Sequence, residues 1–476
     1  MKLNCAGQKI SVIGAGRSGI ASAIALAQRG AEVLLSDGKS TSSLSVDILE
    51  EIKNQGLRFV AQASPIEAIP SGTELVVTSP GVPRSAAVLQ EAIGRSIPIW
   101  SEIELAYRIS PAPIVAITGT NGKTTTTLLT VTVLNSTGKN AVAAGNISAD
   151  ELKKTLVEAA IEAEHDADPN RVLVAEISSF QLEWVHTFKP WIACLTNITP
   201  DHLNRHGSMV EYAAAKAQIF AAQNSSDWAI WNSDDPVSRD LMLHGDLIRD
   251  AQPIAISRNL PADLALPYGC VIDDTLRISL DTKHILDVMP VSQLPDTLPG
   301  EHSIFNALMA SSIGAIAGAE ACQIADGIRS FAGVPHRMEF VAELNGVRYI
   351  NNSMCTNISA ACASLEAVGA PAIVIMGGAD KELDFTPIGP ALCRIARHVV
   401  LIGSAAPKID AAIRGAGYSS ISYAGTMEQA VEVATEHATY GDTVILSPAC
   451  ASFDMFRDFE HRGAAFRQAV RNTVHP

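Results

Sequence analysis

The chain has 476 residues, of which 47% are hydrophobic and 18% charged, and its formal net charge is -15. The length exceeds the roughly 250–300 residues at which one hydrophobic core stops growing, so we expect several domains, and the apolar content excludes wholesale disorder. The acidic balance excludes an extended nucleic-acid-binding surface, which needs clustered Lys and Arg, although a small phosphate pocket built from backbone amides stays open.

The first segment of the chain alternates strand and helix signals. A strand at Lys9–Ile13 leads through a glycine turn into an apolar-periodic helix at Ile20–Arg29 and a second strand at Glu32–Ser36. A further strand signal follows at Glu74–Ser79. This order predicts a parallel α/β sheet. The Pro-containing stretch Ile109–Pro113 predicts an extended linker, which ends this segment.

The second and third segments repeat the α/β pattern. The second opens with a buried strand at Ile114–Thr118, a glycine loop and a Thr-rich helix, and the third begins near Gly333–Arg337. Further strands of the second segment are expected at Val172–Glu176, Trp191–Asn197 and Trp228–Asn232. Strands of the third are expected at Val347–Ile350, Ala372–Met376, His398–Ile402 and Thr443–Leu446.

A glycine-rich turn, GAGRSG at Gly14–Gly19, follows the first strand and opens the first helix. Asp37 ends the next strand, as the acidic residue does in dinucleotide-binding folds. Glycines there let the backbone approach a phosphate at a helix N-terminus, and the acid can bind a ribose or base edge. Two interpretations of this turn stay open here: a tight strand-to-helix turn that binds no ligand, and a nicotinamide or flavin site.

The run TGTNGKTT at Thr118–Thr125 resembles a phosphate loop between an apolar strand and a helix. The usual pattern places its first glycine at the position of Ile117, whereas here the glycine is Gly119. In such a loop backbone amides surround the phosphates, Lys123 reaches the β and γ oxygens, and the Thr124 hydroxyl can bind Mg²⁺.

Acidic and imidazole side chains follow two strands of the second segment. Glu176 ends one strand, and Asp201 and His202 follow the loop after the next. A carboxylate at a strand's C-terminal end beside a phosphate loop can hold Mg²⁺ directly or through water. Tyr212 and Lys216 are four residues apart, so we expect both side chains on one helical face.

Four runs together resemble the Mur ligase family over essentially the whole chain: GTNGKTT, EISSFQLE, NITPDHL and the C-terminal stretch from Leu446 to Gly463. The last run narrows the resemblance to members that add D-glutamate to UDP-N-acetylmuramoyl-L-alanine. The resemblance therefore implies an ATP-dependent ligase of peptidoglycan precursor synthesis that acts through an acyl phosphate.

The resemblance also implies the domain organisation and the cofactors. It implies a Rossmann-like domain for the UDP substrate over residues 1–109, a P-loop-type ATPase domain over 110–333 and a Rossmann-like amino-acid domain over 334–476. It assigns the glycine turn to UDP instead of NAD. Two Mg²⁺ sites are implied, and Lys216 matches a lysine that CO₂ carbamylates, which requires a neutral amine.

Site residues carry over by position. Catalytic candidates are Lys123, Lys216 and His202, and metal candidates are Thr124, Glu176, His202 and Lys216. Nucleotide candidates are Gly119, Thr120, Asn121, Gly122, Lys123, Thr124, Thr125, Asn306, Arg337 and Asn352. UDP-substrate candidates are Arg17, Ser18, Asp37, Lys39, Ser79 and Asn146, and amino-acid candidates are Lys381, Ser452 and Phe459.

The chain departs from the family pattern early in the third segment. Asn352 and Met354 stand where the family commonly has Asp and Lys, and Met354 cannot replace a cation. Smaller changes are Ser303 for Asn and Phe453 for Leu. A paralogue that adds L-glutamate or uses another acceptor is therefore the first alternative. A non-catalytic nucleotide-binding protein, or a dinucleotide oxidoreductase, is the second.

The cysteines and the hydropathy suggest a location. The eight cysteines are scattered without Cys-x-x-Cys spacing, which disfavours a zinc or redox site and a disulfide framework. The first residues lack the pattern of a secretory signal, and no apolar run reaches the ~20 residues of a membrane span. We expect a cytoplasmic monomer with small-molecule substrates and no membrane or nucleic-acid partner.

Overall fold

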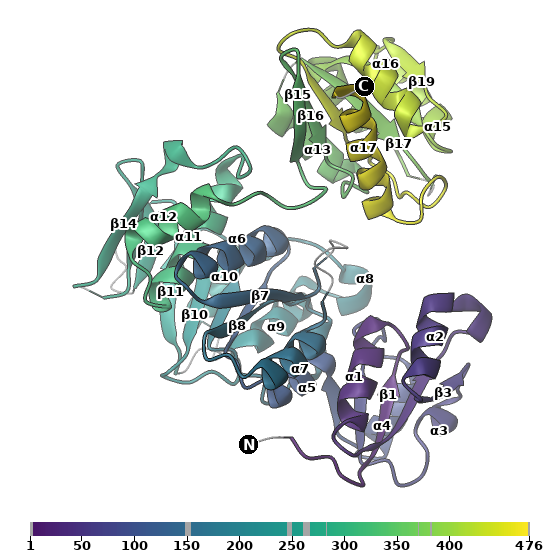
Figure 1. Ribbon diagram of the computed structural model, residues 1–476, viewed down its shortest axis with the longest axis vertical. Helices are drawn as coiled ribbons and strands as arrows, with labels where there is room; N and C mark the ends of the chain where they lie inside the picture. Colours follow the sequence, from purple (N-terminus) through teal and green to yellow (C-terminus); the bar gives the residue numbers. More distant parts are fainter. Residues whose placement is uncertain are drawn as a thin grey trace. The chain divides into compact units, whose positions relative to one another are not determined.

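The computed structural model describes residues 3–147, 154–244, 250–259, 267–281, 283–369, 371–380 and 383–474. The chain divides into two compact units. The first comprises Met1–Leu294 with Glu301–Phe331, and the second comprises Pro295–Gly300 with Ala332–Pro476. The first unit contains two sheets and the second unit one, as the labels of Figure 1 allow the reader to follow.

The first sheet has five parallel strands in the order β3-β2-β1-β4-β5. Its strands are β1 Lys9–Ile13, β2 Glu32–Asp37, β3 Arg58–Ala61, β4 Leu75–Thr78 and β5 Ile99–Ser101. Its helices are α1 Arg17–Ala27, α2 Val46–Asn54, α3 Pro65–Ala68, α4 Ala87–Gly94 and α5 Glu102–Ile109. The first helix begins earlier than its apolar periodicity predicts, because Gly16 is already its N-cap residue.

The second sheet has nine strands in the order β14-β13-β12-β11-β10-β9-β6-β8-β7. They are β6 Ile114–Thr118, β7 Asn140–Gly145, β8 Arg171–Glu176, β9 Ile192–Leu195, β10 Trp228–Asn232, β11 Gln252–Ile256, β12 Tyr268–Ile272, β13 Thr275–Ser279 and β14 Ile285–Pro290. The sheet is parallel except for β13 and β14, which form antiparallel pairs at one edge. The parallel part confirms the predicted central α/β segment, whereas the antiparallel edge was not predicted.

The helices of this segment cover the sheet and build a core that extends into the first sheet. They are α6 Lys123–Ser136, α7 Leu156–Asp166, α8 Leu203–His206, α9 Met209–Ala217, α10 Pro236–His244, α11 Glu301–Ile316 and α12 Ala321–Arg329, with a 3-10 turn, η3, at Gln181–Trp184. One apolar cluster includes Val12 and Leu35 of the first sheet and Ala116 and Leu195 of the second. The two sheets of the first unit therefore share a core.

Polar contacts also join these two sheets. The carboxylate of Glu104 on α5 accepts hydrogen bonds from the backbone N–H groups of His186, Thr187 and Phe188. Arg29, two residues after the end of α1, pairs with Glu164 on α7. The stretch at 109–113, which links the two sheets, is therefore not the only connection between them. The predicted domain boundary at residue 109 stays a prediction.

The second unit holds a six-stranded sheet in the order β15-β16-β20-β17-β18-β19. Its strands are β15 Glu339–Leu344, β16 Val347–Asn351, β17 Ala372–Gly377, β18 Ala396–Ile402, β19 Ile421–Tyr423 and β20 Thr443–Leu446. Its helices are α13 Ile358–Val368, α14 Ile388–Ile395, α15 Ala406–Gly415, α16 Met427–His437 and α17 Phe459–Val474. Only β15 runs antiparallel to its neighbour, and an apolar cluster lies on each face. The predicted α/β class is confirmed.

Within the described residues, no helix has the length and apolarity needed to cross a bilayer. Each of the eight cysteines carries a free thiol.

Candidate active site

The phosphate loop connects β6 to α6 and requires its two glycines. Gly119 and Gly122 have φ angles of 145° and 82°. A Cβ atom on Gly119 would lie 1.9 Å from the Thr196 hydroxyl oxygen, so the close approach of β9 excludes a side chain there. The loop ends at Lys123, where α6 begins. The N-terminus of α6 therefore offers backbone N–H groups and a positive dipole end to a phosphate.

The residues after β9 hold this loop in place. The backbone N–H of Thr120 donates to the Asn197 carbonyl at 2.9 Å, and that of Asn121 donates to the Asn197 side-chain oxygen at 3.0 Å. The Thr196 hydroxyl donates to the Asn121 carbonyl at 2.6 Å. Strand β9 is shorter than predicted because Thr196 and Asn197 leave the sheet to make these bonds. Asn197 opens the run NITPDHL, but nothing in that run indicates this role.

Lys123 and Asn306 lie at the same end of α6. The Lys123 ammonium donates to the Thr120 carbonyl at 2.9 Å. Asn306 of α11 is 4% exposed, and its side-chain oxygen accepts a 3.1 Å hydrogen bond from the Thr126 hydroxyl. A Cβ atom on Gly122 would lie 2.7 Å from that oxygen. The structure thus brings the nucleotide candidate Asn306 against the phosphate loop from a segment about 180 residues away.

Thr124 and Glu176 meet in a buried spot beside the loop. The Thr124 hydroxyl donates to the Glu176 carboxylate at 2.7 Å. The register of β6 and β8, which pairs Ile117 with Glu176, places the end of β8 next to the loop. A hydroxyl and a carboxylate are the hard oxygen ligands that Mg²⁺ prefers, so these two residues fit a Mg²⁺ ion.

His202 is the residue that precedes α8, and its ring lies beside that of Phe180. It has a φ angle of 51° at the start of α8, and its ring is 4.9 Å from the Phe180 ring. Its side chain is 49% exposed and lies 3.5 Å from Asp201. Within the described ranges, no three His, Cys, Asp or Glu side chains gather as a metal cluster.

Lys216 is buried against the phosphate loop. Its side chain is 2% exposed, its ammonium donates to the Gly119 carbonyl at 2.8 Å, and it lies 4.7 Å from the Tyr212 ring centroid. The shared helical face predicted for Tyr212 and Lys216 is confirmed. Burial, together with the nearby Lys123 ammonium, lowers the pKa of Lys216 to about 7. A substantial fraction of this amine is therefore neutral at neutral pH.

The glycine turn of the first sheet is held by Asp37 and Ser79. The Asp37 carboxylate accepts hydrogen bonds from the backbone N–H groups of Ala15 and Lys39, each at 2.8 Å. The Ser79 hydroxyl donates to the Gly14 carbonyl at 3.1 Å. Both side chains therefore shape the turn itself, and the Asp37 carboxylate occupies the Ala15 N–H.

Three of the other UDP-substrate candidates lie near this turn, and the fourth, Asn146, lies in the second sheet's part of the unit. Arg17 and Ser18 open α1, and the Arg17 side chain pairs with Glu158 on α7 at 3.5 Å. Lys39 is exposed after β2. Asn146 donates its backbone N–H to the Glu176 carbonyl at 2.8 Å, so it lies at the edge of the metal-candidate region.

Glu102 and Gln181 form a buried pair that the sequence did not predict. The Gln181 amide donates to Glu102 at 2.8 Å, and its oxygen accepts from the N–H and hydroxyl of Ser178. The second Glu102 carboxylate oxygen has no partner among the described atoms. Burial raises the pKa of Glu102 to about 7, against the opposing effect of the Gln181 hydrogen bond.

The remaining candidates lie in the second unit. The Asn352 side-chain oxygen accepts the Met338 N–H at 3.2 Å, and Ser452 is 2% exposed. Phe459 opens α17, and its carbonyl accepts the Ser353 hydroxyl at 2.7 Å. Arg337 donates its backbone N–H to the Val334 carbonyl. Lys381 lies outside the described residues.

A fully buried arginine joins these loops. Arg462 donates to the Ser353 hydroxyl at 3.0 Å, to the Ser353 carbonyl at 2.8 Å and to the Cys450 carbonyl at 3.0 Å. Burial lowers its pKa to about 10. Arg462 thereby ties the loop of Asn352 to the loop of Ser452. Arg462 lies within the C-terminal run Leu446–Gly463, but nothing in that run indicates this role.

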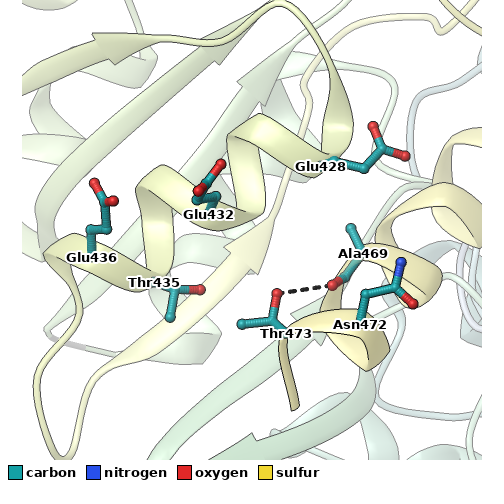
Figure 2. Close-up of a pocket in the computed structure, with 7 residues that line it drawn as sticks. All are labelled: Glu428, Glu432, Thr435, Glu436, Ala469, Asn472 and Thr473. Carbon is teal, nitrogen blue, oxygen red and sulfur yellow. Dashed lines mark hydrogen bonds between the residues drawn. The ribbon is translucent and has the colours of Figure 1, made fainter. Parts of the chain in front are cut away.

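A groove between α16 and α17 lies elsewhere in this unit (Figure 2). Glu428, Glu432 and Glu436 line it at the four-residue spacing of one helical face. None of the candidate residues lines it. We interpret it as a solvated acidic helix face.

Comparison with known proteins gives a consistent result. Residues 117–314 match the Mur ligase middle domain, and residues 336–450 match the Mur ligase, glutamate ligase domain. The UDP-N-acetylmuramoylalanine--D-glutamate ligase of Pelotomaculum thermopropionicum is 40% identical over 463 residues, which cover 97% of each chain. That of a Thermoanaerobacter species is 40% identical over 469 residues, which cover 98% of each.

Solved structures share the fold. The UDP-N-acetylmuramate-alanine ligase MurC of Thermotoga maritima superposes with a TM-score of 0.57 at 16% identity, covering 98% of this chain and 99% of that one. A pseudomurein peptide ligase type C of Methanothermus fervidus gives a TM-score of 0.51 at 19% identity, covering 98% and 100%.

Proposed function

The chain belongs to the Mur ligase family, and on that basis we propose that it is an ATP-dependent ligase that joins D-glutamate to UDP-N-acetylmuramoyl-L-alanine in peptidoglycan precursor synthesis. The observation that carries the proposal is the meeting of Lys123, Lys216 and the Thr124–Glu176 pair at one phosphate loop. Such a loop holds a nucleotide triphosphate and does not serve a nicotinamide or flavin oxidoreductase.

Two Mg²⁺ sites are part of the proposal. In the unmodified protein, the candidate Mg²⁺ ligands are Thr124, Glu176 and His202. Lys216 would contribute after its neutral amine attacks CO₂: an N–C bond forms, a proton is lost, and a carbamate oxygen becomes a ligand. Mg²⁺ bound there would neutralise charge on the phosphate oxygens.

The reaction then has two steps. The terminal carboxylate of the UDP substrate attacks the γ-phosphorus of ATP, the bond to the ADP oxygen breaks, and an acyl phosphate forms. The amine of D-glutamate attacks the acyl carbon, phosphate leaves, and the amine loses a proton as the amide forms. The Lys123 ammonium, when it leaves the Thr120 carbonyl for the γ-phosphate, stabilises the charge that develops there.

Each substrate has its own set of proposed binding residues. The proposed UDP-binding residues are Arg17, Ser18, Asp37, Lys39, Ser79 and Asn146. The proposed nucleotide residues beyond the loop are Asn306, Arg337 and Asn352. The proposed glutamate residues are Lys381, Ser452 and Phe459, because a cation and a hydroxyl suit carboxylates. The cytoplasmic location, the monomeric state and the three domain boundaries stay predictions.

One observation favours an alternative substrate. Asn352 and Met354 replace an acid and a base, and Phe453 beside Ser452 is 70% exposed. A changed pocket of this kind suits a paralogue that uses L-glutamate or another acceptor.

Phosphate release from ATP tests both the proposed D-glutamate ligase and the alternative paralogue. The assay contains UDP-N-acetylmuramoyl-L-alanine and Mg²⁺, with D-glutamate, L-glutamate or neither. Release that depends on D-glutamate supports the proposed function. Release with L-glutamate alone favours the paralogue. If neither glutamate causes phosphate release by folded enzyme that binds ATP, the proposed function is contradicted, and the enzyme either uses a different acceptor or has lost its activity.

A further inference from the structure

Arg205 lies where the UDP-substrate side of the first unit meets the phosphate side. It belongs to α8, three residues after His202. Its guanidinium forms a two-point pair with the Glu183 carboxylate, at 3.1 Å from Nε and 3.0 Å from Nη2. The two side chains are only 16% and 9% exposed. A shielded two-point pair fixes the relative geometry of two segments, unlike a loose surface ion pair.

The same guanidinium also binds the loop that follows β4. Nη1 donates to the Pro80 carbonyl at 2.8 Å, and Nη2 donates to the Val82 carbonyl at 3.1 Å. This loop begins at Ser79, whose hydroxyl bonds the glycine turn at Gly14. Arg205 is therefore connected to the proposed UDP site through one short loop.

One face of the guanidinium covers an aromatic cluster on the phosphate side. The Arg205 guanidinium carbon lies 4.0 Å from the Phe180 ring centroid. The Phe180 ring lies 4.9 Å from the ring of His202 and stacks on His206 at 5.4 Å. His206 in turn contacts Tyr212, whose hydroxyl is 3.1 Å from that of Thr120 in the phosphate loop. A continuous set of contacts thus runs from Arg205 to the phosphate site.

We propose that Arg205 is a positioning residue of the ligase reaction, which sets the loop at Pro80–Val82 in register with His202 and the phosphate loop. This inference rests on the proposed function. The reacting carboxylate lies at the opposite end of the substrate from its UDP group. Its distance from the γ-phosphate therefore depends on how these two regions are held, and a misplacement of about 1 Å can cost roughly 100-fold in rate.

The Arg29–Glu164 pair provides a matched control. It also joins the first sheet to the second, and its side chains are 11% and 16% exposed. It contacts α1 and α7 and does not involve the loop after β4 or Phe180. Removing either arginine breaks a largely buried pair between the same two sheets, but only Arg205 bonds the loop that follows Ser79.

The first measurement compares the steady-state kinetics of Arg205→Met and Arg29→Met. We expect Arg205→Met to raise KM for the UDP substrate about tenfold and to lower kcat/KM about 100-fold, with KM for D-glutamate unchanged. Arg29→Met stays within about twofold of wild type. A merely structural role would reduce the amount of folded enzyme, which lowers the apparent kcat and leaves KM unchanged.

A second pair of variants separates positioning from the burial of a lone charge. Arg205→Met leaves the Glu183 carboxylate buried without its cation, which by itself destabilises the fold. The double variant Arg205→Met with Glu183→Gln removes that charge. We expect the double variant to recover thermal stability but not KM. Recovery of KM in the double variant would overturn the inference.

Hydrogen exchange provides a readout without substrate. We expect backbone amides at residues 79–84 and 200–206 to exchange faster in Arg205→Met than in Arg29→Met and wild type. Equal exchange in the two variants would overturn the inference even if the enzyme is a ligase. If wild type releases no phosphate with either glutamate, the proposed function fails, while the exchange rates still decide whether Arg205 couples these segments.

Discussion

The hydroxyl group of Thr124 donates a 2.7 Å hydrogen bond to the buried carboxylate of Glu176. The bond joins the first turn of α6 to the end of β8. It places two oxygen atoms side by side next to the phosphate loop. Under the proposed function these are Mg²⁺ ligands, so we expect the Mg²⁺ requirement of the enzyme to depend on this pair.

Thr124→Ala removes the hydroxyl ligand and leaves Glu176 in place. We expect the Mg²⁺ concentration for half-maximal phosphate release to rise about tenfold and kcat to fall about 100-fold. Thr124→Ser keeps the hydroxyl and should retain most of the activity. Thr127→Val removes another buried hydroxyl of α6, one that has no partner among the described atoms, and serves as the matched control. Similar Mg²⁺ curves for Thr124→Ala and Thr127→Val would contradict a ligand role.

Lys216→Arg tests the carbamate. An arginine stays charged and cannot attack CO₂, so we expect activity to fall at least about 100-fold although a cation is retained. The pKa of Lys216 is lowered to about 7, so its neutral form, and with it carbamate formation, increases as the pH rises through that value. Carbon-13 NMR of enzyme equilibrated with labelled bicarbonate should show a carbamate signal in wild type only. A signal of equal size in Lys216→Arg would place the modification elsewhere.

Glu102 makes the stability of the first unit depend on pH. Its pKa is about 7 in the fold and 4.5 ordinarily, so the folded chain holds a proton between these values that the unfolded chain has lost. The free energy of unfolding therefore falls as the pH rises through this window, by on the order of 3 kcal/mol, and the loss is complete above about pH 7.

Glu102→Gln keeps an acceptor for Gln181 but does not ionise, so we expect its stability advantage over wild type to be larger at pH 8 than at pH 5. Urea unfolding followed by tryptophan fluorescence measures this, because all five tryptophans lie in the first unit. Glu50→Gln controls for the loss of an exposed carboxylate. A constant difference between Glu102→Gln and wild type across this range would refute the prediction.

Met354→Lys restores the cation that the family commonly has. We expect kcat/KM for D-glutamate or ATP to rise several-fold, because a cation near the reacting phosphate or carboxylate stabilises negative charge, and the effect should be strongest at low salt. Met354→Leu preserves volume and adds no charge, so it should resemble wild type. If Lys and Leu at this position give the same kinetics, Met354 does not face the reacting groups.

Local patterns predicted much of the fold and part of the site. Strands β1, β6, β10 and β20 have the bounds that the sequence predicted, because each is a short apolar run with clear limits. Glu176 and the phosphate loop come together as predicted, since the C-terminal ends of adjacent parallel strands share one sheet edge. The Tyr212–Lys216 face follows from helical spacing alone.

Other features depend on partners that no local pattern identifies. Arg205 contacts Val82 across 123 residues, and Gln181 contacts Glu102 across 79. In the sequence, Arg205 and Glu102 each resemble a solvated surface charge. The antiparallel edge of the second sheet was also missed, because Asp273 and Asp274 form its turn at positive φ without a glycine.

The carboxylate of Glu104 has a consequence for the order in which the chain can fold during synthesis. Its partners at 186–188 are made at least 82 residues later. At about 5–20 residues per second, the ribosome needs on the order of ten seconds to supply them. During that interval the Glu104 carboxylate on α5 lacks these backbone hydrogen bonds, so the packing of α5 is complete only after residues 186–188 have been made. A helix of the N-terminal part thus obtains its final hydrogen bonds only from residues that are synthesised later.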